Sequence, residues 1–239
     1  HGICNFMDTT VEYLNISLSV YQQEQFAVYE QLLLEWNEKF NLTAVRDIGG
    51  IRIKHFLDSL TCTKALGDLN GKNLADIGTG AGFPGIPLKI LFPEMNLLLA
   101  DATGKKVNFC QHVIQTLGLK NSRAIQARAE EMGLSKEHRE RYDVVAARAV
   151  ARLPILCEYL LPLVKIGGVM IAQKGETAAD ELAQSKKAIQ ILGGKNQSIL
   201  SVSMPFFEDR RYLVLIQKAS ATPFNYPRRT GLPSQKPIL

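Results

Sequence analysis

Apolar and aromatic positions recur every three or four residues between positions 26 and 60. The first set is Phe26, Tyr29, Leu33, Trp36 and Phe40, and the second is Ile53, Phe56, Leu57 and Leu60. This spacing predicts two amphipathic helices. Ser19 and Gln22 precede the first set at the spacing of a capping box, so we expect that helix to begin there. In the second helix, Lys54 and Asp58 are four residues apart, as in a solvated ion pair or a ligand-facing cluster.

From Asn73 onward, short apolar runs alternate with helical patterns, which is typical of a parallel sheet with helices on both faces. We predict parallel strands near residues 73–77, 95–100, 122–126, 142–147 and 168–173. We predict helices near residues 84–92, 104–117, 153–165 and 176–192, the last three closed by glycines. Two further strand-like runs, 198–204 and 211–218, are not separated by a helix, so we expect them to pair in antiparallel fashion.

A glycine-rich stretch, DIGTGAGFPG from Asp76 to Gly85, joins the first predicted strand to the next helix. Glycine allows the backbone to approach a ligand closely. The dinucleotide fingerprint G-x-G-x-x-G/A requires a small residue where this chain has Phe83, and a phosphate-binding P-loop requires a Lys-Ser/Thr pair that is absent here. The turn therefore favours a ligand other than a dinucleotide or a nucleoside triphosphate.

Two acidic residues favour S-adenosylmethionine (SAM) as that ligand. Asp76 stands at the mouth of the turn, where a carboxylate repels a pyrophosphate and attracts an ammonium group. Asp101 ends the second predicted strand, close to the position at which an acid meets ribose hydroxyls, and it could at the same time cap the following helix. Since SAM carries an amino group, a sulfonium and a ribose but no phosphate, we predict that this turn binds SAM.

Five parallel strands followed by an antiparallel hairpin differ from the plan of nicotinamide-dependent dehydrogenases. We predict an α/β fold with the seven-stranded, Rossmann-like sheet of SAM-dependent methyltransferases and an N-terminal helical extension. The predicted parts are the extension at 1–65, a SAM-binding core at 66–221 and a basic, proline-rich tail at 222–239, within one compact domain. With 239 residues, 46% of them hydrophobic, the chain can bury one such core. Residues 1–17 show no clear period, and we expect them to be loosely ordered.

Residues that follow the later strands are further candidates, because ligands of open α/β sheets bind beyond the carboxyl ends of the strands. Ala129 and Glu130 follow the third strand and could meet the adenine, although Glu130 could also be an exposed charge. Arg148 directly follows an apolar strand, a poor place for an unpaired cation, and Lys174 lies on the same rim. After the fourth strand we find no Asn/Asp-Pro-Pro-aromatic sequence and no Pro-Cys pair, which argues against methylation of exocyclic amines and of pyrimidine carbons.

Composition and charge add few constraints. No apolar run reaches the ~18 residues of a membrane span, and no secretory signal is visible. The cysteines Cys4, Cys62, Cys110 and Cys157 are scattered, which favours reduced thiols in the cytoplasm over a disulfide framework or a metal site. The net charge of +5 permits a polyanionic partner. We expect the tail, with its four prolines, to be extended and either to wrap the core or to bind a phosphate backbone, with Tyr226 able to stack on a base.

Beyond these arguments, the chain resembles the GidB/RsmG family of bacterial small-subunit ribosomal RNA guanine-N7 methyltransferases, from about Leu32 to its end. The resemblance is carried by Glu35–Thr43, Lys54–Ser59, Asp76–Pro87, Arg148–Ala151 and Tyr226–Gly231. It implies SAM contacts at Gly78, Phe83, Asp101, Ala102, Thr103, Ala129, Glu130 and Arg148, which together with Asp76 and Gly80 form the predicted cofactor site.

The chemistry that this resemblance implies needs no catalytic acid or base, because guanine N7 has a free lone pair and no proton. We therefore expect a monomeric cytoplasmic enzyme, without a membrane partner, that methylates N7 of one unpaired guanine in 16S ribosomal RNA. The candidate RNA-binding residues are Lys54, His55, Arg152, Lys174, Arg228, Arg229 and Lys236. The alternatives are a SAM-dependent methyltransferase of a small molecule or protein, and a non-catalytic assembly factor that binds SAM or RNA.

Overall fold

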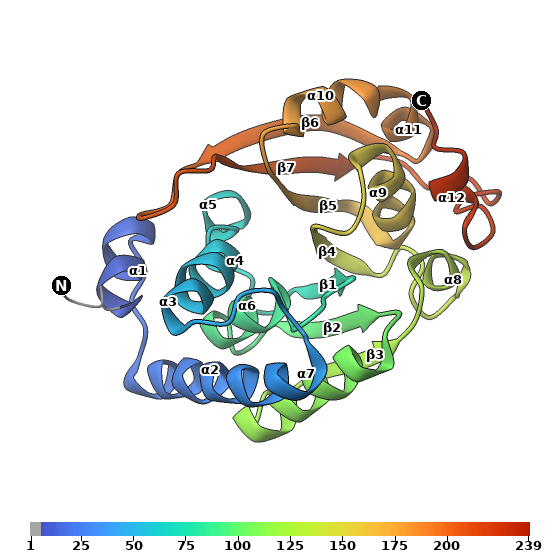
Figure 1. Ribbon diagram of the computed structural model, residues 1–239. Helices are drawn as coiled ribbons and strands as arrows, with labels where there is room; N and C mark the ends of the chain where they lie inside the picture. The colour runs from blue at the N-terminus through green and yellow to red at the C-terminus, as the bar shows by residue number, and fades with distance from the viewer. Residues whose placement is uncertain (1–5) are drawn as a thin grey trace.

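The computed structural model describes residues 6–239, which form a seven-stranded sheet with helices on both faces (Figure 1). The strands are β1 (Asn73–Ile77), β2 (Asn96–Asp101), β3 (Ser122–Gln126), β4 (Tyr142–Arg148), β5 (Val164–Lys174), β6 (Gly194–Val202) and β7 (Arg211–Lys218). Their order across the sheet is β3-β2-β1-β4-β5-β7-β6, and β7 is antiparallel to both of its neighbours. The predicted fold class and the antiparallel final hairpin are confirmed.

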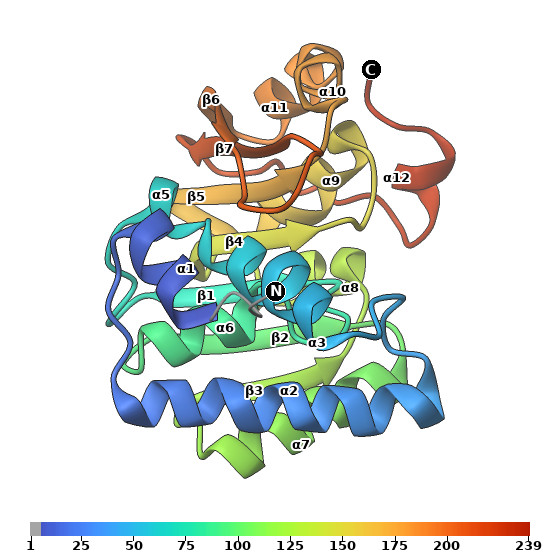
Figure 2. The ribbon, with the colours of Figure 1, turned by 60° about the vertical axis from the view of Figure 1, so that its left-hand side comes forward.

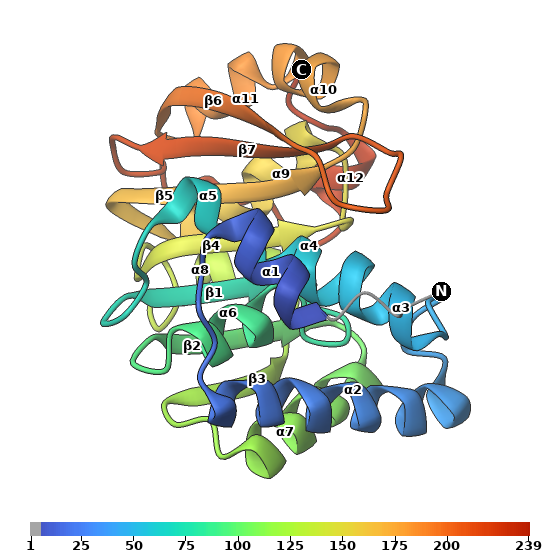
Figure 3. The same cartoon turned by 90° about the vertical axis from the view of Figure 1, so that its left-hand side faces the viewer.

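The N-terminal helices, α6 and α7 cover one face of the sheet (Figures 2 and 3). They are α1 (Phe6–Leu14), α2 (Val20–Phe40), α3 (Ile48–Gly50), η1 (Ile51–Leu57), α4 (Asp58–Leu60), α5 (Thr63–Leu66), α6 (Gly85–Leu91) and α7 (Gly104–Leu117). The other face carries α8 (Ala129–Leu134), α9 (Leu153–Leu160), η2 (Leu161–Leu163), α10 (Ala178–Gln184), α11 (Lys186–Ile191) and α12 (Leu232–Gln235). Among residues 6–239, no helix has the length and apolar character that a membrane crossing requires.

Successive residues of the central strands belong to two different hydrophobic clusters. Leu74 and Leu99 pack in the cluster under the N-terminal helices, whereas their chain neighbours Ala75 and Leu98 pack in the cluster under α9 and α11. This alternation follows from the two-residue period of a β-strand. Because both faces are covered, β1 and β2 are buried at every position after the first.

Both predicted N-terminal helices are present. In the capping box of α2, the Gln22 N–H donates to Ser19 Oγ (3.1 Å) and the Ser19 N–H donates to Gln22 Oε1 (2.8 Å). Tyr29 is fully buried against the core, so α2 docks on the sheet domain. The second helix is a continuous helical segment from residue 48 to residue 60, and its central part, η1, is π-helical.

The expectation that residues 1–17 are loosely ordered is wrong for α1. Tyr13 and Leu14 of this helix pack against the core beside the N-terminal helices. The ring of Tyr13 also lies 3.8 Å from Lys64 Nζ. The residues that α1 contacts are distant from it in the sequence, so no local hydrophobic period indicates these contacts. Residues 1–5, including Cys4, lie outside the described residues.

The strand predicted at 198–204 begins earlier, as β6, and two predicted helices also differ from their predicted bounds. The helix predicted at 153–165 ends earlier, and β5 begins at Val164, so that Gly167 and Gly168 lie inside the strand. A Cβ on Gly168 would lie 2.7 Å from the Asp143 carbonyl oxygen, so this glycine permits close packing of β5 on β4. The helix predicted at 176–192 is two helices, and the Ser185 hydroxyl between them donates to the Glu181 carbonyl (2.7 Å), a bond that bends helices.

The tail runs back over the second face of the sheet through turns at Pro223–Tyr226 and Arg229–Leu232 and the four-residue helix α12, so the expectation of an extended tail is wrong for these parts. Arg139 anchors it by donating to the carbonyls of Thr222 (2.7 Å), Pro223 (3.1 Å) and Tyr226 (2.7 Å). Pro227 packs directly on Gly133 of α8, where an added Cβ would lie 2.6 Å from the proline ring. Of the two sequence interpretations, these contacts favour a tail that wraps the core.

Candidate functional site

The sheet has a topological switch point between β1 and β4, because β2 and β3 lie on one side of it and β5, β7 and β6 on the other. Ligands of open α/β sheets bind beyond the carboxyl ends of the strands at such a point. The glycine-rich turn follows β1, Asp101 ends β2, Ala129 begins α8 after β3, and Arg148 ends β4. The fold therefore brings the predicted cofactor residues to one edge of the sheet.

The glycine-rich turn requires glycine at three alternate positions. Gly78, Gly80 and Gly82 have φ values of 65°, 60° and 103°, in the left-handed region that other residues rarely adopt. A Cβ at Gly78 would lie 2.6 Å from a methyl group of Val150, and one at Gly82 would lie 2.6 Å from the Tyr29 hydroxyl. The turn thus packs tightly against the segment that follows β4 and against α2.

Asp76 stabilises the glycine-rich turn through its side chain. Its side chain is fully buried, and its Oδ2 accepts hydrogen bonds from the Thr79 hydroxyl (2.7 Å) and the Gly85 N–H (2.9 Å). Its Oδ1 is buried and has no partner among the described residues. Burial raises the pKa of Asp76 to about 7, although the two hydrogen bonds and Arg148 oppose this rise. A buried carboxylate oxygen without a partner fits the amino group of SAM, and the same residue also organises the turn.

Asp101 joins the turn to the end of β2. Its Oδ2 accepts from the Gly80 N–H (2.9 Å) and its Oδ1 accepts from the Thr103 N–H (2.9 Å). The N-cap residue of α7 is Thr103, so the alternative assignment of Asp101 as the helix cap is wrong. Each carboxylate oxygen can accept more than one hydrogen bond, so Asp101 keeps acceptor capacity for ribose hydroxyls.

A cavity of about 330 Å³ lies beside Asp101, within the size range of small-molecule sites. We call it the tail-side cavity. Its lining includes five predicted cofactor residues, Gly78, Asp101, Ala102, Ala129 and Glu130. It also includes residues that the sequence analysis missed, among them Val150, Tyr159, Thr230, Gly231 and Ser234. Glu130 Oε2 accepts the Gly231 N–H (2.9 Å) and so ties the tail to this cavity.

Arg148 forms the centre of a second group of residues at the end of β4, which we call the Arg148 cluster: Arg148, His55, Asp58, Phe83 and Thr43. Arg148 Nη1 donates to the Lys54 carbonyl (3.0 Å) and to Asp58 Oδ2 (3.1 Å), and Nη2 donates to His55 Nδ1 (3.0 Å). The His55 ring stacks on Phe83 of the glycine-rich turn, with 4.5 Å between ring centroids. The cluster therefore bridges the turn after β1 and the end of β4.

Asp58 is the anionic centre of this cluster and is 1% exposed. Besides Arg148, it accepts two hydrogen bonds from Arg211 of β7 (3.0 and 3.2 Å), and its carbonyl accepts one from Gln173 (2.8 Å). The expectation of a solvated Lys54–Asp58 ion pair is therefore wrong. The helical segment places Asp58 toward the sheet, where it is buried, and leaves Lys54 exposed. Lys54 Nζ instead lies 5.6 Å from the ring of Phe207.

Histidine 55 is held neutral in this environment. Burial lowers its pKa to about 3, and the neighbouring Arg148 charge adds to the effect. Both of its ring nitrogens are within hydrogen-bond distance of protein groups, Arg148 at Nδ1 and Thr43 at Nε2 (2.7 Å). In this arrangement His55 orients its neighbours and has no free nitrogen for proton transfer to a ligand.

The seven candidate RNA-binding residues divide into two groups. Lys54, Arg152, Arg229 and Lys236 are exposed. His55, Lys174 and Arg228 are engaged within the protein: Lys174 pairs with Glu181 (3.1 Å), and Arg228 pairs with the buried Glu158 (2.7 Å). The second group is less available to a phosphate than the first, and all seven assignments stay predictions.

The free cysteines of the described chain, Cys62, Cys110 and Cys157, are buried. Burial raises the pKa of each thiol, that of Cys157 to about 12. A thiol with a raised pKa is a poor nucleophile at neutral pH. Within residues 6–239 there is also no group of three or more His, Cys, Asp or Glu side chains placed to hold a metal ion.

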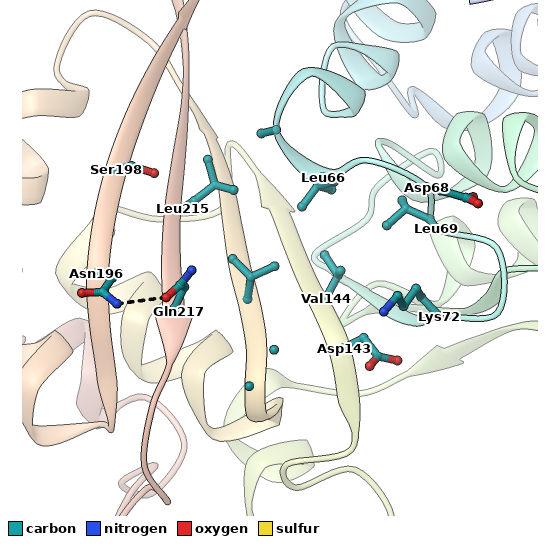
Figure 4. A pocket seen from close by; sticks show the side chains of 14 residues that line it. Leu66, Asp68, Leu69, Lys72, Asp143, Val144, Asn196, Ser198, Leu215 and Gln217 are labelled. Carbon is teal, nitrogen blue, oxygen red and sulfur yellow. Dashed lines mark hydrogen bonds between the residues drawn. The ribbon is translucent and has the colours of Figure 1, made fainter.

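A cavity of about 430 Å³ lies at the opposite edge of the sheet, near the beginning of β4 and the loop before β1 (Figure 4). Asp143, Lys72, Asn196 and Gln217 are among the residues that line it, and Asn196 donates to Gln217 (3.1 Å). None of the predicted cofactor residues lines it. Because ligands of such sheets bind at the carboxyl edge, we assign the site to the tail-side cavity and the Arg148 cluster.

A protein-family model described as rRNA small subunit methyltransferase G (GidB) matches residues 22–213. A protein of Desulforamulus reducens named ribosomal RNA small subunit methyltransferase G is 48% identical over 225 residues, which cover 94% of each chain. One of the same name from Acetivibrio thermocellus is 47% identical and covers 93% of this chain and 91% of that one.

Solved structures of SAM-dependent methyltransferases share the fold. A SAM-dependent O-methyltransferase from Thermotoga maritima has a TM-score of 0.54 and 12% identity, over 80% of this chain and 72% of that one. A predicted O-methyltransferase from Agrobacterium tumefaciens has a TM-score of 0.56 and 17% identity, over 69% of this chain and 82% of that one. At these identities the likeness concerns the fold alone.

Proposed function

The chain belongs to the GidB family of ribosomal RNA small subunit methyltransferases G, and on this premise we propose that it transfers the methyl group of SAM to N7 of one guanine in 16S ribosomal RNA. The observation that carries the proposal is the meeting of the glycine-rich turn, Asp101 and Arg148 at the switch point of the sheet. The ribosomal substrate makes the cytoplasm the proposed site of action, and we expect a monomer.

The residues at this edge fit the chemical groups of SAM. Asp101 and Glu130 offer carboxylate oxygens beside the tail-side cavity for ribose hydroxyls and the adenine amine. Asp76 offers its unpartnered Oδ1 to the ammonium group. Arg148 uses three N–H groups within the protein and has two more for a carboxylate. We propose the full cofactor set as Asp76, Gly78, Gly80, Phe83, Asp101, Ala102, Thr103, Ala129, Glu130 and Arg148.

Bound SAM supplies an electrophilic methyl group. As the lone pair of guanine N7 forms the new N–C bond, the bond between the methyl carbon and the sulfonium sulfur would break, and its electron pair would stay on the sulfur of a departing thioether. No proton is lost, so the protein needs no general base. The neutral and fully engaged His55 agrees with this requirement. The contribution of the chain is then to align the two reactants and exclude water, which can lower the barrier by ~7–11 kcal/mol.

The RNA target is best an unpaired or splayed guanine, because A-form helices hide the N7 edge in a deep, narrow groove. In the proposed arrangement the exposed Lys54, Arg152, Arg229 and Lys236 contact phosphates. We propose that the chain divides into an extension at 1–65, a core at 66–221 and a tail at 222–239. Each of these three parts would then contribute at least one cation to RNA binding.

Nucleoside mass spectrometry of 16S ribosomal RNA tests this proposal. RNA from a strain that lacks the protein should lose one 7-methylguanosine, and the purified protein should restore it with SAM. Unchanged 7-methylguanosine content would refute the proposal. Transfer to a small molecule or protein instead of RNA, or SAM binding without any turnover, would establish one of the alternative functions.

Replacement of Asp101 tests the cofactor site separately. Asp101→Ala should weaken SAM binding at least about 10-fold in titration calorimetry, because a charge-assisted hydrogen bond is lost. Asp180→Ala, a change at an exposed aspartate of α10, is the matched control and should bind SAM normally. Circular dichroism of both variants checks the fold. Normal SAM affinity in a folded Asp101→Ala protein would show that the ribose lies elsewhere.

A further inference from the structure

The loop between α2 and α3 brings Thr43 to the Arg148 cluster. The Thr43 N–H donates to Oδ1 of the buried Asn37 (2.9 Å), which fixes the backbone of the loop at this residue. The Thr43 side chain is half-buried and lies against His55, whose ring stacks on Phe83 of the glycine-rich turn. Thr43 is thus linked through the His55 ring to the glycine-rich turn, beside which the proposed function has the methyl acceptor meet the methyl donor.

The direction of each hydrogen bond around Thr43 follows from the donors available. Arginine can only donate, so His55 Nδ1 accepts from Arg148 Nη2. The proton of a neutral imidazole must then be on Nε2, which donates to Thr43 Oγ1 (2.7 Å). The lowered pKa of His55 agrees with the neutral ring. Asp58, through Arg148, thus sets the tautomer of His55.

The Thr43 oxygen accepts a second hydrogen bond from the Val45 N–H (3.2 Å). Both lone pairs of the hydroxyl are then occupied, and its own proton donates to no group in residues 6–239. A hydroxyl usually serves as either donor or acceptor, but this one can only donate. The hydroxyl proton of the half-buried Thr43 therefore remains available to a ligand.

From this arrangement we propose that the Thr43 hydroxyl donates a hydrogen bond to O6 of the target guanine and so selects guanine over adenine. The inference rests on the proposed function and adds a specificity-determining residue to it. Guanine carries the O6 acceptor beside N7, whereas adenine carries an amino group, a donor, at the same position. A hydroxyl with both lone pairs occupied cannot accept from that amine. Adenine would therefore leave two donors facing each other.

Base and side-chain replacements together test this interaction. The wild-type protein is first used to locate the methylated guanine, and that base is then replaced by 2-aminopurine, which keeps N7 but lacks O6. The wild type should methylate the guanine substrate about 10- to 100-fold more efficiently in kcat/KM, as expected for one specific base contact. Thr43→Val, which removes only the hydroxyl, should lower kcat/KM for guanine to a similar extent and abolish most of the preference.

Two further variants serve as controls. Thr43→Ser retains the hydroxyl and should restore the preference for guanine. Thr63→Val removes a hydroxyl of α5 that donates only to the Leu60 carbonyl of α4 (2.7 Å), and it should leave both rates unchanged. SAM affinity, measured by calorimetry, should be the same in Thr43→Val and wild type, because the contact is to the base.

The outcomes separate this inference from the proposed function. If the wild type forms no 7-methylguanosine, the proposed function fails and this inference fails with it. If the wild type forms 7-methylguanosine but methylates guanine and 2-aminopurine substrates equally, the inference alone is overturned, even where Thr43→Val does not fold. A folded Thr43→Val protein that keeps the full preference for guanine would overturn it as well.

Discussion

The Arg148 cluster and the tail-side cavity lie on the same edge of the sheet, yet they use charged groups differently. In the cluster, the Asp58 carboxylate pairs with both Arg148 and Arg211 and is fully engaged within the protein. At the cavity, Asp101 and Glu130 accept hydrogen bonds from backbone N–H groups and form no ion pair within residues 6–239. The cluster thus keeps only donors free, on Arg148 and Thr43, whereas the cavity offers carboxylate oxygens to a ligand.

This difference suits the two tasks of a methyltransferase. The half that we propose to align the acceptor must be rigid, because a misplacement of about 1 Å can cost about 100-fold in rate. The half that we propose to hold SAM must admit a new molecule at every turnover. The rigid half is supplied by the N-terminal helices and β7, whereas the exchangeable half is closed by the tail.

The largest expected effect is the loss of Asp58. Asp58→Ala leaves two guanidinium groups, 14% and 25% exposed, without their carboxylate. Removal of one partner from such a buried pair costs about 3–5 kcal/mol, which urea unfolding would measure. Glu30→Ala breaks the more exposed pair with Arg52 and should cost about 1 kcal/mol or less. Equal losses in the two variants would show that the cluster is not the rigid half.

The pH dependence of stability should report the burial of Asp76. Its folded-state pKa is raised from 3.8 to about 7, so its contribution to stability is fully present below pH 4 and is lost as the pH rises through 7. Since one pKa unit corresponds to about 1.4 kcal/mol, this loss is at most about 4 kcal/mol. Asp76→Asn cannot ionise, so its free energy of unfolding should not show this decline. If the free energy of unfolding changed with pH in the same way in both proteins, the raised pKa of Asp76 would be contradicted.

A smaller effect is expected at the tail. Arg139→Gln removes the charged donor that binds the carbonyls of Thr222, Pro223 and Tyr226, at a cost of about 2 kcal/mol. Because the tail lines the cavity, SAM affinity should fall and trypsin should cut after Arg229 faster. Arg123→Gln, at an exposed pair with Glu137, is the matched control and should change neither. Unchanged SAM affinity in Arg139→Gln would show that the position of the tail does not affect the tail-side cavity as a SAM site.

Most strands were predictable because their signals are local. The alternation of apolar runs with helical patterns located β1, β3 and β7 within a residue. The start of β5 was not predictable, because Gly167 and Gly168 have the appearance of a helix end. Only the approach of Gly168 to the Asp143 carbonyl of the neighbouring strand explains why they lie inside a strand.

The candidate site was predictable in part for the same reason. Asp76, Gly78 and Gly80 belong to one short motif whose conformation depends on left-handed backbone angles, so the sequence revealed them. Thr43 and Asp58 lie in stretches that carry the family resemblance, Glu35–Thr43 and Lys54–Ser59, but these stretches do not indicate what the two side chains contact. Their roles depend on His55, Arg148 and Arg211, and the last two lie on distant strands.

The sequence by itself determined the starts of α2, α7 and α9, the glycine-rich turn, the order of strands along the chain and the family. These features follow from steric limits on backbone angles and from hydrogen bonds between near neighbours. Only the tertiary structure decided that Asp58 pairs with Arg211, 153 residues away, and that the Gly231 N–H donates to Glu130, 101 residues away. The physical reason is that a buried charge or polar group must find a partner, and packing of the whole chain decides which partner is within reach.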